Sequence, residues 1–416
     1  MLHVIQQIMN LGAVVMLPIV MFILGLIFRM KIGKALKAGL MVGIGFSGLQ
    51  LVINLLMTTV DPAIQHYKGI DSSRFTTVDV GWAAMGAASW SVPFAAAAVL
   101  LIVVINIVLI LTKATKVLNV DIWNFIHFLI PGTLAYAITH NAIIGLVVTV
   151  GLSVITLFVA QKIGPRWQEF YGLKGTTCTT FSYITFALPL AIGFNWLIDR
   201  IPKVRDIDIS MEKTGERLGF FGDTAFVGLI VGVFLGLITR QSWQTTLTMG
   251  MGIAAVLVLL PRMVSVMMEG LTIIGDGASD FMKRRVKDDR ELFIGMDVAL
   301  SLGDPTAITV SVILIPLAIA YAFIIPNMAY FPVGLLTGIV YMVPFFSLAS
   351  KGNLFRTLIS SAIFLFIVEV LANLFAPQAT AMMNATGVKI TGQVTDGFFG
   401  YNLANVVISA LHMIFG

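Results

Sequence analysis

The chain has 416 residues, of which 58% are hydrophobic and 11% are charged, against a charged fraction of roughly 25% in soluble domains. This composition excludes a soluble globular protein and predicts a polytopic membrane protein with an all-α fold. The net charge of +5 does not indicate a nucleic-acid partner, because the basic residues lie in short gaps between apolar runs, as the positive-inside rule describes.

Apolar runs long enough to cross roughly 30 Å of hydrocarbon predict about 11 transmembrane helices in one integral-membrane domain, residues 1–416. The runs cover residues 11–29, 38–60, 93–112, 120–140, 142–161, 219–239, 243–268, 306–325, 333–349, 357–376 and 398–416. Placing the basic gaps, such as Arg29 to Lys37, in the cytoplasm puts the N-terminus outside and the C-terminus inside. The single cysteine, Cys178, excludes an internal disulfide framework and a multi-cysteine metal site.

A first polar insertion, residues 77–96, follows the first two predicted spans. It holds Asp79, Gly81 and Trp82 among small residues. A carboxylate accepts hydrogen bonds from a hydroxylated ligand, and an indole packs against the C–H face of such a ligand, so these residues are candidates for substrate binding. The alternative is an extracellular loop in which Asp79 caps a helix and Trp82 lies at the membrane interface.

A second insertion, residues 119–132, places polar side chains inside an apolar span. On a helix, the spacing of three between Asp121, Asn124 and His127 puts them on one face, which we interpret as part of a binding surface. Alternatively, Asp121 only caps the helix and His127 is a packing residue. His127 has no second His or Cys at a ligand spacing, so we expect neither a metal site nor a cofactor.

A third insertion, residues 175–193, is rich in hydroxyl groups. Thr179 and Thr180 are able to donate hydrogen bonds to a ligand, although serine and threonine also bond their own helix backbone. Their neighbour Cys178 has no activating His or basic residue beside it in the sequence, so no phosphoryl-transfer role is assigned to it.

A fourth insertion, residues 294–311, carries Asp297 and Asp304 among glycines and Pro305. An ionised carboxylate near the bilayer centre costs about 2.5 to 3.5 kcal/mol on insertion scales, so such groups normally face a protein-lined cavity. Broken backbone at that depth is tolerated where it lines such a cavity, which predicts a re-entrant hairpin. Both aspartates are candidate ligand contacts. Asp297 is the stronger one, because Asp304 followed by Pro305 also fits a helix N-cap followed by proline at the first helical position.

The first and fourth insertions resemble each other, since each has an Asp-Val pair, then small residues, then a proline before a long apolar helix. With an odd number of spans per half, residues 1–200 and 219–416 would form inverted repeats, which commonly place broken segments and the binding site near the membrane midplane. Chance similarity between two Gly/Ala-rich stretches is the alternative.

Four motifs together resemble a known family. VDVGW (78–82), LNVDIWNFIHF (118–128), FIGMDVALSLGDPTAI (293–308) and KGNLFRTLIS (351–360), in this order and spacing, are similar to the galactitol-type enzyme IIC of the bacterial phosphotransferase system. The resemblance extends across most of the chain. At Cys178 the chain departs from the family pattern, where a histidine in a PHGT-like run is expected, and this leaves the third contact open.

The resemblance implies a permease of the bacterial inner membrane that binds an alditol outside and carries it inward. A separate IIB protein, itself supplied by IIA, would phosphorylate the sugar, so no phosphoryl donor is expected in this chain. The superfamily implies a homodimer in which a core domain moves against a V-shaped scaffold. By position, its ligand contacts would fall near residues 79–82, 124–129 and 178–180 and at Asp297.

Two other functions stay open on the sequence alone. An ion-coupled secondary transporter for a polyol or sugar would use Asp297 or Asp304 as a proton site, and it would need no partner protein. An intramembrane transferase acting on lipid would need a metal or phosphate site, and the acidic residues show no DxxD-type clustering.

Overall fold

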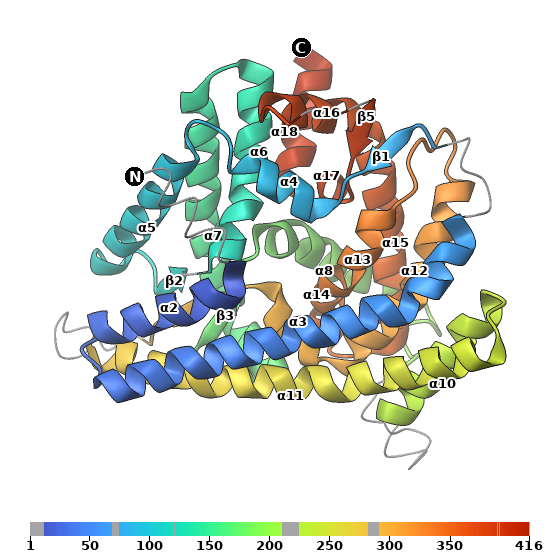
Figure 1. The fold of residues 1–416 in the computed structure, drawn as a ribbon, viewed down its shortest axis with the longest axis horizontal. Helices are drawn as coiled ribbons and strands as arrows, with labels where there is room; N and C mark the ends of the chain where they lie inside the picture. The colour runs from blue at the N-terminus through green and yellow to red at the C-terminus, as the bar shows by residue number, and fades with distance from the viewer. Residues whose placement is uncertain are drawn as a thin grey trace.

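The computed structural model describes residues 12–68, 75–119, 121–209, 224–281, 291–388, 390 and 392–415. Helices make up most of this part of the chain (Figure 1). They are α2 (Gly12–Ile27), α3 (Ile32–Lys68), α4 (Gly81–Ser89), α5 (Ala95–Leu111), α6 (Ile122–Thr139), α7 (Ala142–Tyr171), α8 (Leu188–Ile198), α10 (Thr224–Ile238), α11 (Trp243–Phe281), α12 (Pro305–Ile324), α13 (Val333–Met342), α14 (Pro344–Ser350), α15 (Leu354–Leu374), α16 (Ala376–Ala385), α17 (Phe398–Tyr401) and α18 (Leu403–Phe415).

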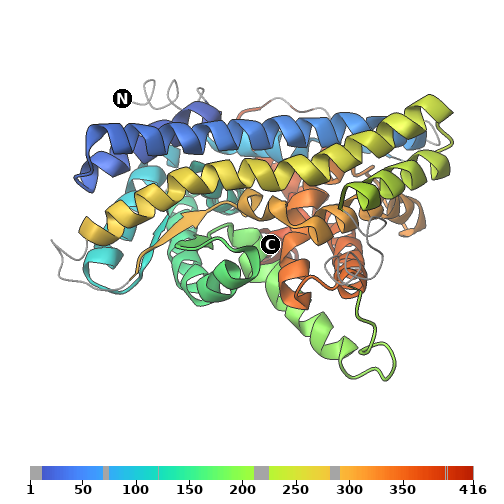
Figure 2. The same cartoon turned by 90° about the horizontal axis from the view of Figure 1, so that it is seen from below.

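The longest helices, α3 and α11, lie side by side along the longest axis of the molecule, as Figures 1 and 2 both show. Glycines allow their backbones to approach closely. A Cβ atom added at Gly45 would lie 2.5 Å from the backbone nitrogen of Met267, and one at Gly270 would lie 2.5 Å from the carbonyl oxygen of Ala38. Helix α2 packs on α3, and α10 packs on α11. We call α2, α3, α10 and α11 the long-helix layer.

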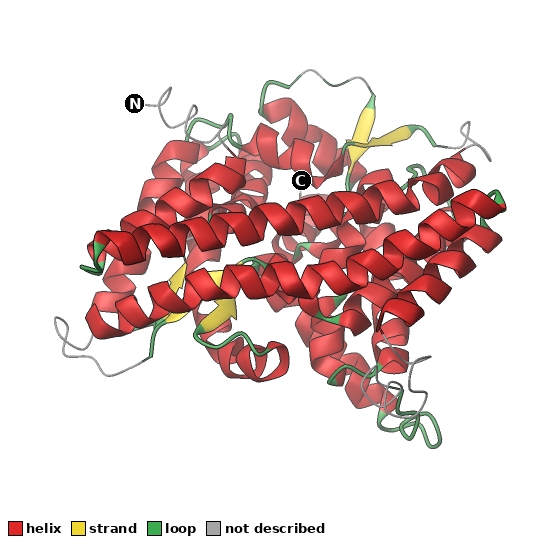
Figure 3. Cartoon of the chain, turned by 60° about the horizontal axis from the view of Figure 1, so that its bottom comes forward, coloured by secondary structure: helices red, strands yellow, loops and turns green. Residues whose placement is uncertain are grey.

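Short strands sit at two separate places among the remaining helices (Figure 3). They are β1 (Thr77–Asp79), β2 (Val117–Asn119), β3 (Thr176–Cys178), β4 (Phe293–Met296) and β5 (Gln393–Thr395). One sheet pairs β1 with β5 in parallel, and the other has the order β2-β4-β3, also parallel. The sequence predicted polar interruptions at or next to β1, β2, β3 and β4, but not at β5. It predicted no strands, because strands of three or four residues are too short to show an alternating pattern.

The two sheets exchange strands between the halves of the chain. Strand β1, from the first half, lies against β5 and also bridges to Tyr330, both from the second half. Strand β4, from the second half, lies between β2 and β3 from the first. Each polar insertion is therefore fixed to the half of the chain to which it does not belong.

Apolar helices confirm that this is a mostly helical membrane protein. Within the described residues, those long and apolar enough to cross a bilayer by length and composition are Ile32–Ala63, Ala142–Tyr171, Pro305–Ile324 and Leu354–Leu374. Shorter apolar helices lie in several of the other predicted spans, including α5, α10 and α18. The number of crossings and the position of the termini remain predictions.

Candidate functional site

The polar insertions meet around a cavity of about 250 Å³. It lies between the long-helix layer and the remaining helices with their short strands, which we call the strand-bearing core. Helix α3 contributes Phe46 and Gln50 to its wall. The core contributes the other lining residues, which are Gly81, Trp82, His127, Tyr183, Asp297, Val298, Ala299, Gly334, Leu335, Gly338, Tyr341, Asp396 and Tyr401. The wall thus combines carboxyl, amide, imidazole and phenol groups with aromatic faces.

Asp297 stands at the end of β4, where the chain turns into a short 3₁₀ helix, η4 (Val298–Gly303). Its Oδ1 accepts a hydrogen bond from the backbone N–H of Ala299 at 2.9 Å. Its Oδ2 accepts one from the hydroxyl of Thr180 at 3.0 Å. Because an ionised carboxylate has about four acceptor positions, Asp297 keeps capacity for the hydroxyl groups of a ligand.

Asp121 and Thr180 hold this turn in place rather than line the cavity. Oδ2 of Asp121 accepts the backbone N–H of Asp297 at 3.0 Å, and Oγ1 of Thr180 accepts the backbone N–H of Val298 at 2.9 Å. Strand β4 lies between β2 and β3, so the residues just after those strands, Asp121 and Thr180, flank Asp297. The pairing of the strands therefore fixes the orientation of the carboxylate.

His127 lies on α6 and faces the cavity from among aromatic rings. Its ring centroid is 5.4 Å from that of Trp82 and 5.3 Å from that of Phe398. Its Nδ1 is hydrogen-bonded to the hydroxyl of Ser182 at 2.8 Å, and Asn402 donates to the same hydroxyl at 3.0 Å. With Nδ1 occupied, Nε2 is the ring nitrogen left for a ligand.

Asp79 and Asp396 form a second acidic group, at the end of the β1–β5 pair. Oδ2 of Asp79 accepts the backbone N–H of Gly334 at 2.8 Å, so this carboxylate binds the N-terminal end of α13. Asp396 accepts the backbone N–H of Phe398 at 3.0 Å and lines the cavity. Because β1 pairs with β5 in parallel, the two carboxyl groups lie at the same end of this sheet.

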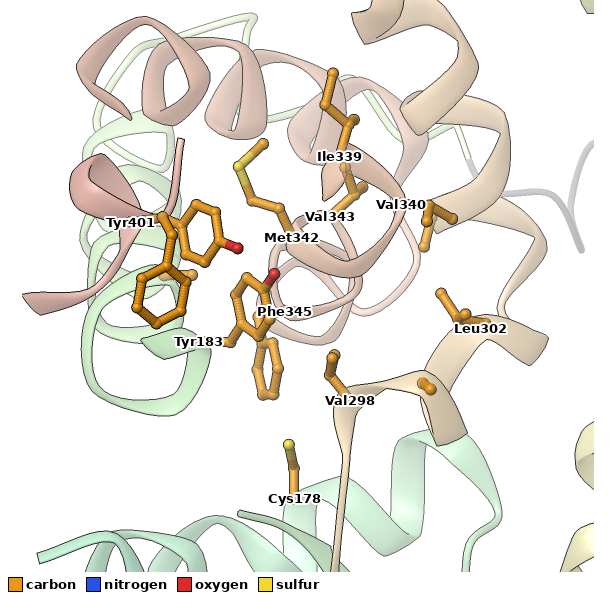
Figure 4. Close-up of a cluster of buried hydrophobic side chains, with 14 of the residues drawn as sticks. Cys178, Tyr183, Val298, Leu302, Ile339, Val340, Met342, Val343, Phe345 and Tyr401 are labelled. Atoms are coloured by element: carbon orange, nitrogen blue, oxygen red, sulfur yellow. The ribbon is translucent and has the colours of Figure 1, made fainter. Parts of the chain in front are cut away.

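Stacked aromatic rings close the cavity on the side of α17. The rings of Tyr183 and Tyr401 are 5.3 Å apart and nearly parallel, and Phe345 lies 6.1 Å beyond Tyr183 (Figure 4). Tyr183 begins a π-helical turn, η1 (Tyr183–Ala187), ahead of α8. Such turns are often found at functional sites. Cys178 belongs to the same buried apolar cluster. It is fully buried and does not line the cavity.

The structure separates the residues predicted from the sequence into three groups. Those lining the cavity are Gly81, Trp82, His127 and Asp297. Those bonded to its wall are Asp79, Asp121 and Thr180. Those away from it are Asn124, Thr179, Cys178 and Asp304.

The three polar residues in this last group have structural contacts of their own. The Asn124 amide donates to the Thr179 hydroxyl at 2.8 Å, and both side chains are fully buried. Asp304 accepts the backbone N–H of Thr306 at 3.0 Å and caps α12, with Pro305 at the start of the helix. It lines a different cavity, of about 400 Å³, on the far end of η4.

Sequence reasoning missed Asp396, Gln50 and the three tyrosines of the wall. A sequence pattern could have identified Asp396, because VTDGF (394–398) resembles TVDVG (77–81), and each has a short strand with an Asp at or just after its end and then a Gly. No sequence pattern marks the tyrosines as site residues, because a tyrosine in an apolar segment is more often a core residue.

Comparison with known proteins decides the family. Residues 7–393 match the family described as PTS system sugar-specific permease component, EIIC-GAT. The chain belongs to this family. A putative permease IIC component of Escherichia coli K12 is 32% identical over 388 residues, covering 93% of this chain and 88% of that protein. The galactitol-specific EIIC components of E. coli K12 and O157:H7 are each 32% identical, covering 99% of this EIIC-GAT chain and 94% of the relative.

The family match confirms the resemblance drawn from the four motifs and makes this chain a membrane-embedded sugar permease component of a phosphotransferase system. In such a system a sugar is the substrate and a IIB component is the protein partner. The site described above is thus the candidate sugar site of an EIIC-GAT permease.

Proposed function

We propose that this permease binds galactitol or a related alditol in the 250 Å³ cavity and carries it inward for phosphorylation by a separate IIB protein, which IIA supplies with phosphoryl groups. The observation that carries the proposal is the pairing of two carboxylates, Asp297 and Asp396, with aromatic faces in a cavity wall without lysine or arginine among the described residues. The galactitol-specific names of two relatives agree with it.

An alditol is neutral and offers only hydroxyl groups, each of which both donates and accepts. Each buried polar group left unpaired costs about 1 to 3 kcal/mol, so its site needs several acceptors. Asp297, Asp396, Gln50 and His127 supply them, while Trp82 supplies a flat apolar face for the carbon chain. An anionic substrate would be repelled by the same carboxylates.

Phosphorylation favours release from this site. It adds nearly two negative charges at neutral pH, and the product would then lie beside Asp297 and Asp396. The direction of transport therefore follows from the chemistry of the partner protein, with no phosphoryl-donor residue needed in this chain.

We extend the proposal to the architecture. Residues 1–200 and 219–416 form inverted repeats, supported by the exchange of β1 and β4 between the halves. The long-helix layer is the dimerisation scaffold, and the strand-bearing core is the domain that moves against it. The N-terminus lies outside and the C-terminus in the cytoplasm of the bacterial inner membrane, as the basic gaps predict.

The test is galactitol uptake into vesicles containing the purified permease. Our proposal predicts accumulation of the phosphorylated sugar only when phosphorylated IIB is present on the cytoplasmic side. Uptake without any phosphorylation would contradict it.

One observation favours a second candidate, a proton-coupled polyol carrier. Asp79 and Asp396 lie at the same end of the β1–β5 pair, and Asp396 lines the cavity, so these carboxyl groups are placed to carry a proton beside the substrate. Its test uses the same vesicles without IIB, with an imposed proton gradient. Accumulation of unmodified galactitol, abolished by Asp396→Asn, would establish the carrier in place of group translocation.

A further inference from the structure

A larger cavity, of about 580 Å³, lies at one end of the long-helix layer and shares no lining residue with the sugar cavity. It is formed by the turn between α2 and α3 and by the last turns of α11, which meet at the same end of the layer (Figure 1). The turn is tight, with Arg29 in the left-handed backbone region at φ 56°. Apolar side chains, including Phe28 and Phe281, complete the wall.

Basic side chains dominate the charge of this cavity. Its wall holds Arg29, Lys31, Lys34 and Lys37, facing two carboxylates of α11, Asp276 and Asp280. Among the described lining residues, four positive and two negative groups give a net charge of +2. Across the described residues, none of the four cations forms an ion pair.

The N-terminal end of α3 adds to this positive potential. The helix starts at Ile32, runs for 37 residues and has no acidic residue in its first turn. The aligned peptide dipoles of a long helix favour an anion at its N-terminus. The cavity is thus built for an anionic group.

An apolar strip leads away from the cavity along α3. Ile32, Leu36, Leu40 and Ile44 recur every four residues and are 69%, 49%, 53% and 57% exposed. Residues at this spacing share one face of a helix. An anion-binding cavity at the head of an exposed apolar strip matches the two parts of a phospholipid.

We propose that this cavity binds the phosphodiester headgroup of an anionic phospholipid, whose acyl chains lie along Ile32, Leu36, Leu40 and Ile44. The net charge of +2 accommodates one phosphodiester, as in phosphatidylglycerol, or the two of cardiolipin. Basic pockets between membrane helices on the cytoplasmic side recognise such headgroups. The site is independent of the sugar cavity and of the function proposed for it.

The test measures lipid binding to the full-length protein in detergent, by native mass spectrometry and by the lipid-induced rise in melting temperature. Phosphatidylglycerol and cardiolipin are compared with phosphatidylcholine. We expect anionic lipids to bind at least tenfold more tightly than phosphatidylcholine. The double variant Lys34→Gln/Lys37→Gln should bind them about 30-fold more weakly, since each basic residue near an anionic lipid contributes roughly a factor of five.

The matched control is Lys162→Gln/Lys174→Gln, which removes the same charge from exposed residues elsewhere. Equal loss of binding in this control, or equal binding of phosphatidylcholine, would overturn the proposal. Inorganic phosphate at equal ionic strength tests for a free-anion site. Stabilisation by phosphate as large as that by lipid would overturn the lipid assignment. So would a change in oligomeric mass in Leu36→Ser/Leu40→Ser without any change in lipid binding, because it would assign the strip to a second copy of the chain.

Discussion

The backbone N–H of Asp297 donates a 3.0 Å hydrogen bond to the carboxylate of Asp121, 176 residues earlier in the chain. Both residues stand just after strands of one sheet, so the sheet sets the distance between them. This contact holds the β4–η4 turn and aims the Asp297 side chain at the sugar cavity. We therefore expect residues behind the wall, as well as those in it, to affect binding.

Replacing Asp121 tests that contact. Asp121→Ala leaves the half-buried N–H of Asp297 without this acceptor, at a cost of up to about 1 to 3 kcal/mol, and we expect weaker alditol binding along with lower stability. Asp121→Asn retains an acceptor oxygen, so its losses of alditol affinity and of stability should be much smaller. Binding and melting curves of the two variants make the comparison. Equal losses in both would contradict a role based on the hydrogen bond.

A matched pair of threonine variants separates binding from stability. Thr180→Val removes the donor to Asp297 Oδ2 and the acceptor for Val298 N–H, so we expect alditol affinity to fall about tenfold, consistent with roughly 1 to 2 kcal/mol. Thr179→Val breaks the buried hydrogen bond from Asn124 and the longer ones to Asn119 and Met296, none of which involves the side chain of Asp297. It should lower the melting temperature and leave the affinity of the folded protein near that of wild type. Calorimetric titration with both variants checks this, and a reversed order of affinities would refute it.

Two glycines of α13 give a test of the Asp79 contact. A Cβ at Gly334 would lie 2.5 Å from Asp79 Oδ1, whereas one at Gly338 has no atom within 4 Å. Gly334→Ala should displace the carboxylate from the helix end and destabilise the protein by about 1 kcal/mol or more. Gly338→Ala should be neutral or stabilising by up to about 1 kcal/mol, because alanine is the better helix former. Thermal unfolding in detergent measures both, and equal shifts would mean that the contact contributes nothing.

Charge in the cavity should discriminate against the phosphorylated product. Galactitol phosphate should bind wild type at least tenfold more weakly than galactitol, because its phosphate lies near Asp297 and Asp396. Asp396→Asn removes one of these carboxylates and should reduce the difference in affinity between galactitol and galactitol phosphate. Competition binding at neutral pH measures the ratio. Tight product binding by wild type would rule out release by repulsion.

Much of the site was predictable because the sequence breaks its own apolar pattern there. Asp79, Trp82, His127 and Asp297 each stood out as polar or amphipathic groups between long apolar runs, and the structure places all four at or beside one cavity. The N-cap role of Asp304 followed from the proline after it, and the structure confirms that cap.

The remainder depended on contacts that a single sequence does not reveal. The bonding of Asn124 to Thr179 turns two apparent ligand contacts into buried structure. Cys178 looked like part of the hydroxyl-rich stretch, but β3 directs it into the apolar cluster. The pairing of β1 with β5 brings Asp396 beside Asp79 across more than three hundred residues, a distance over which no periodicity carries information.

The decisive experiment on the proposed sugar site is equilibrium binding of galactitol to the purified permease, with Asp297→Asn and Asp304→Asn measured beside wild type. A hydrogen bond to a charged group contributes about 1.5 to 3 kcal/mol, so Asp297→Asn should weaken binding roughly 10- to 150-fold. Asp304→Asn, which alters a helix cap lining the other cavity, should bind galactitol like wild type. Galactitol binding that survives Asp297→Asn but disappears in Asp304→Asn would contradict the site proposed here.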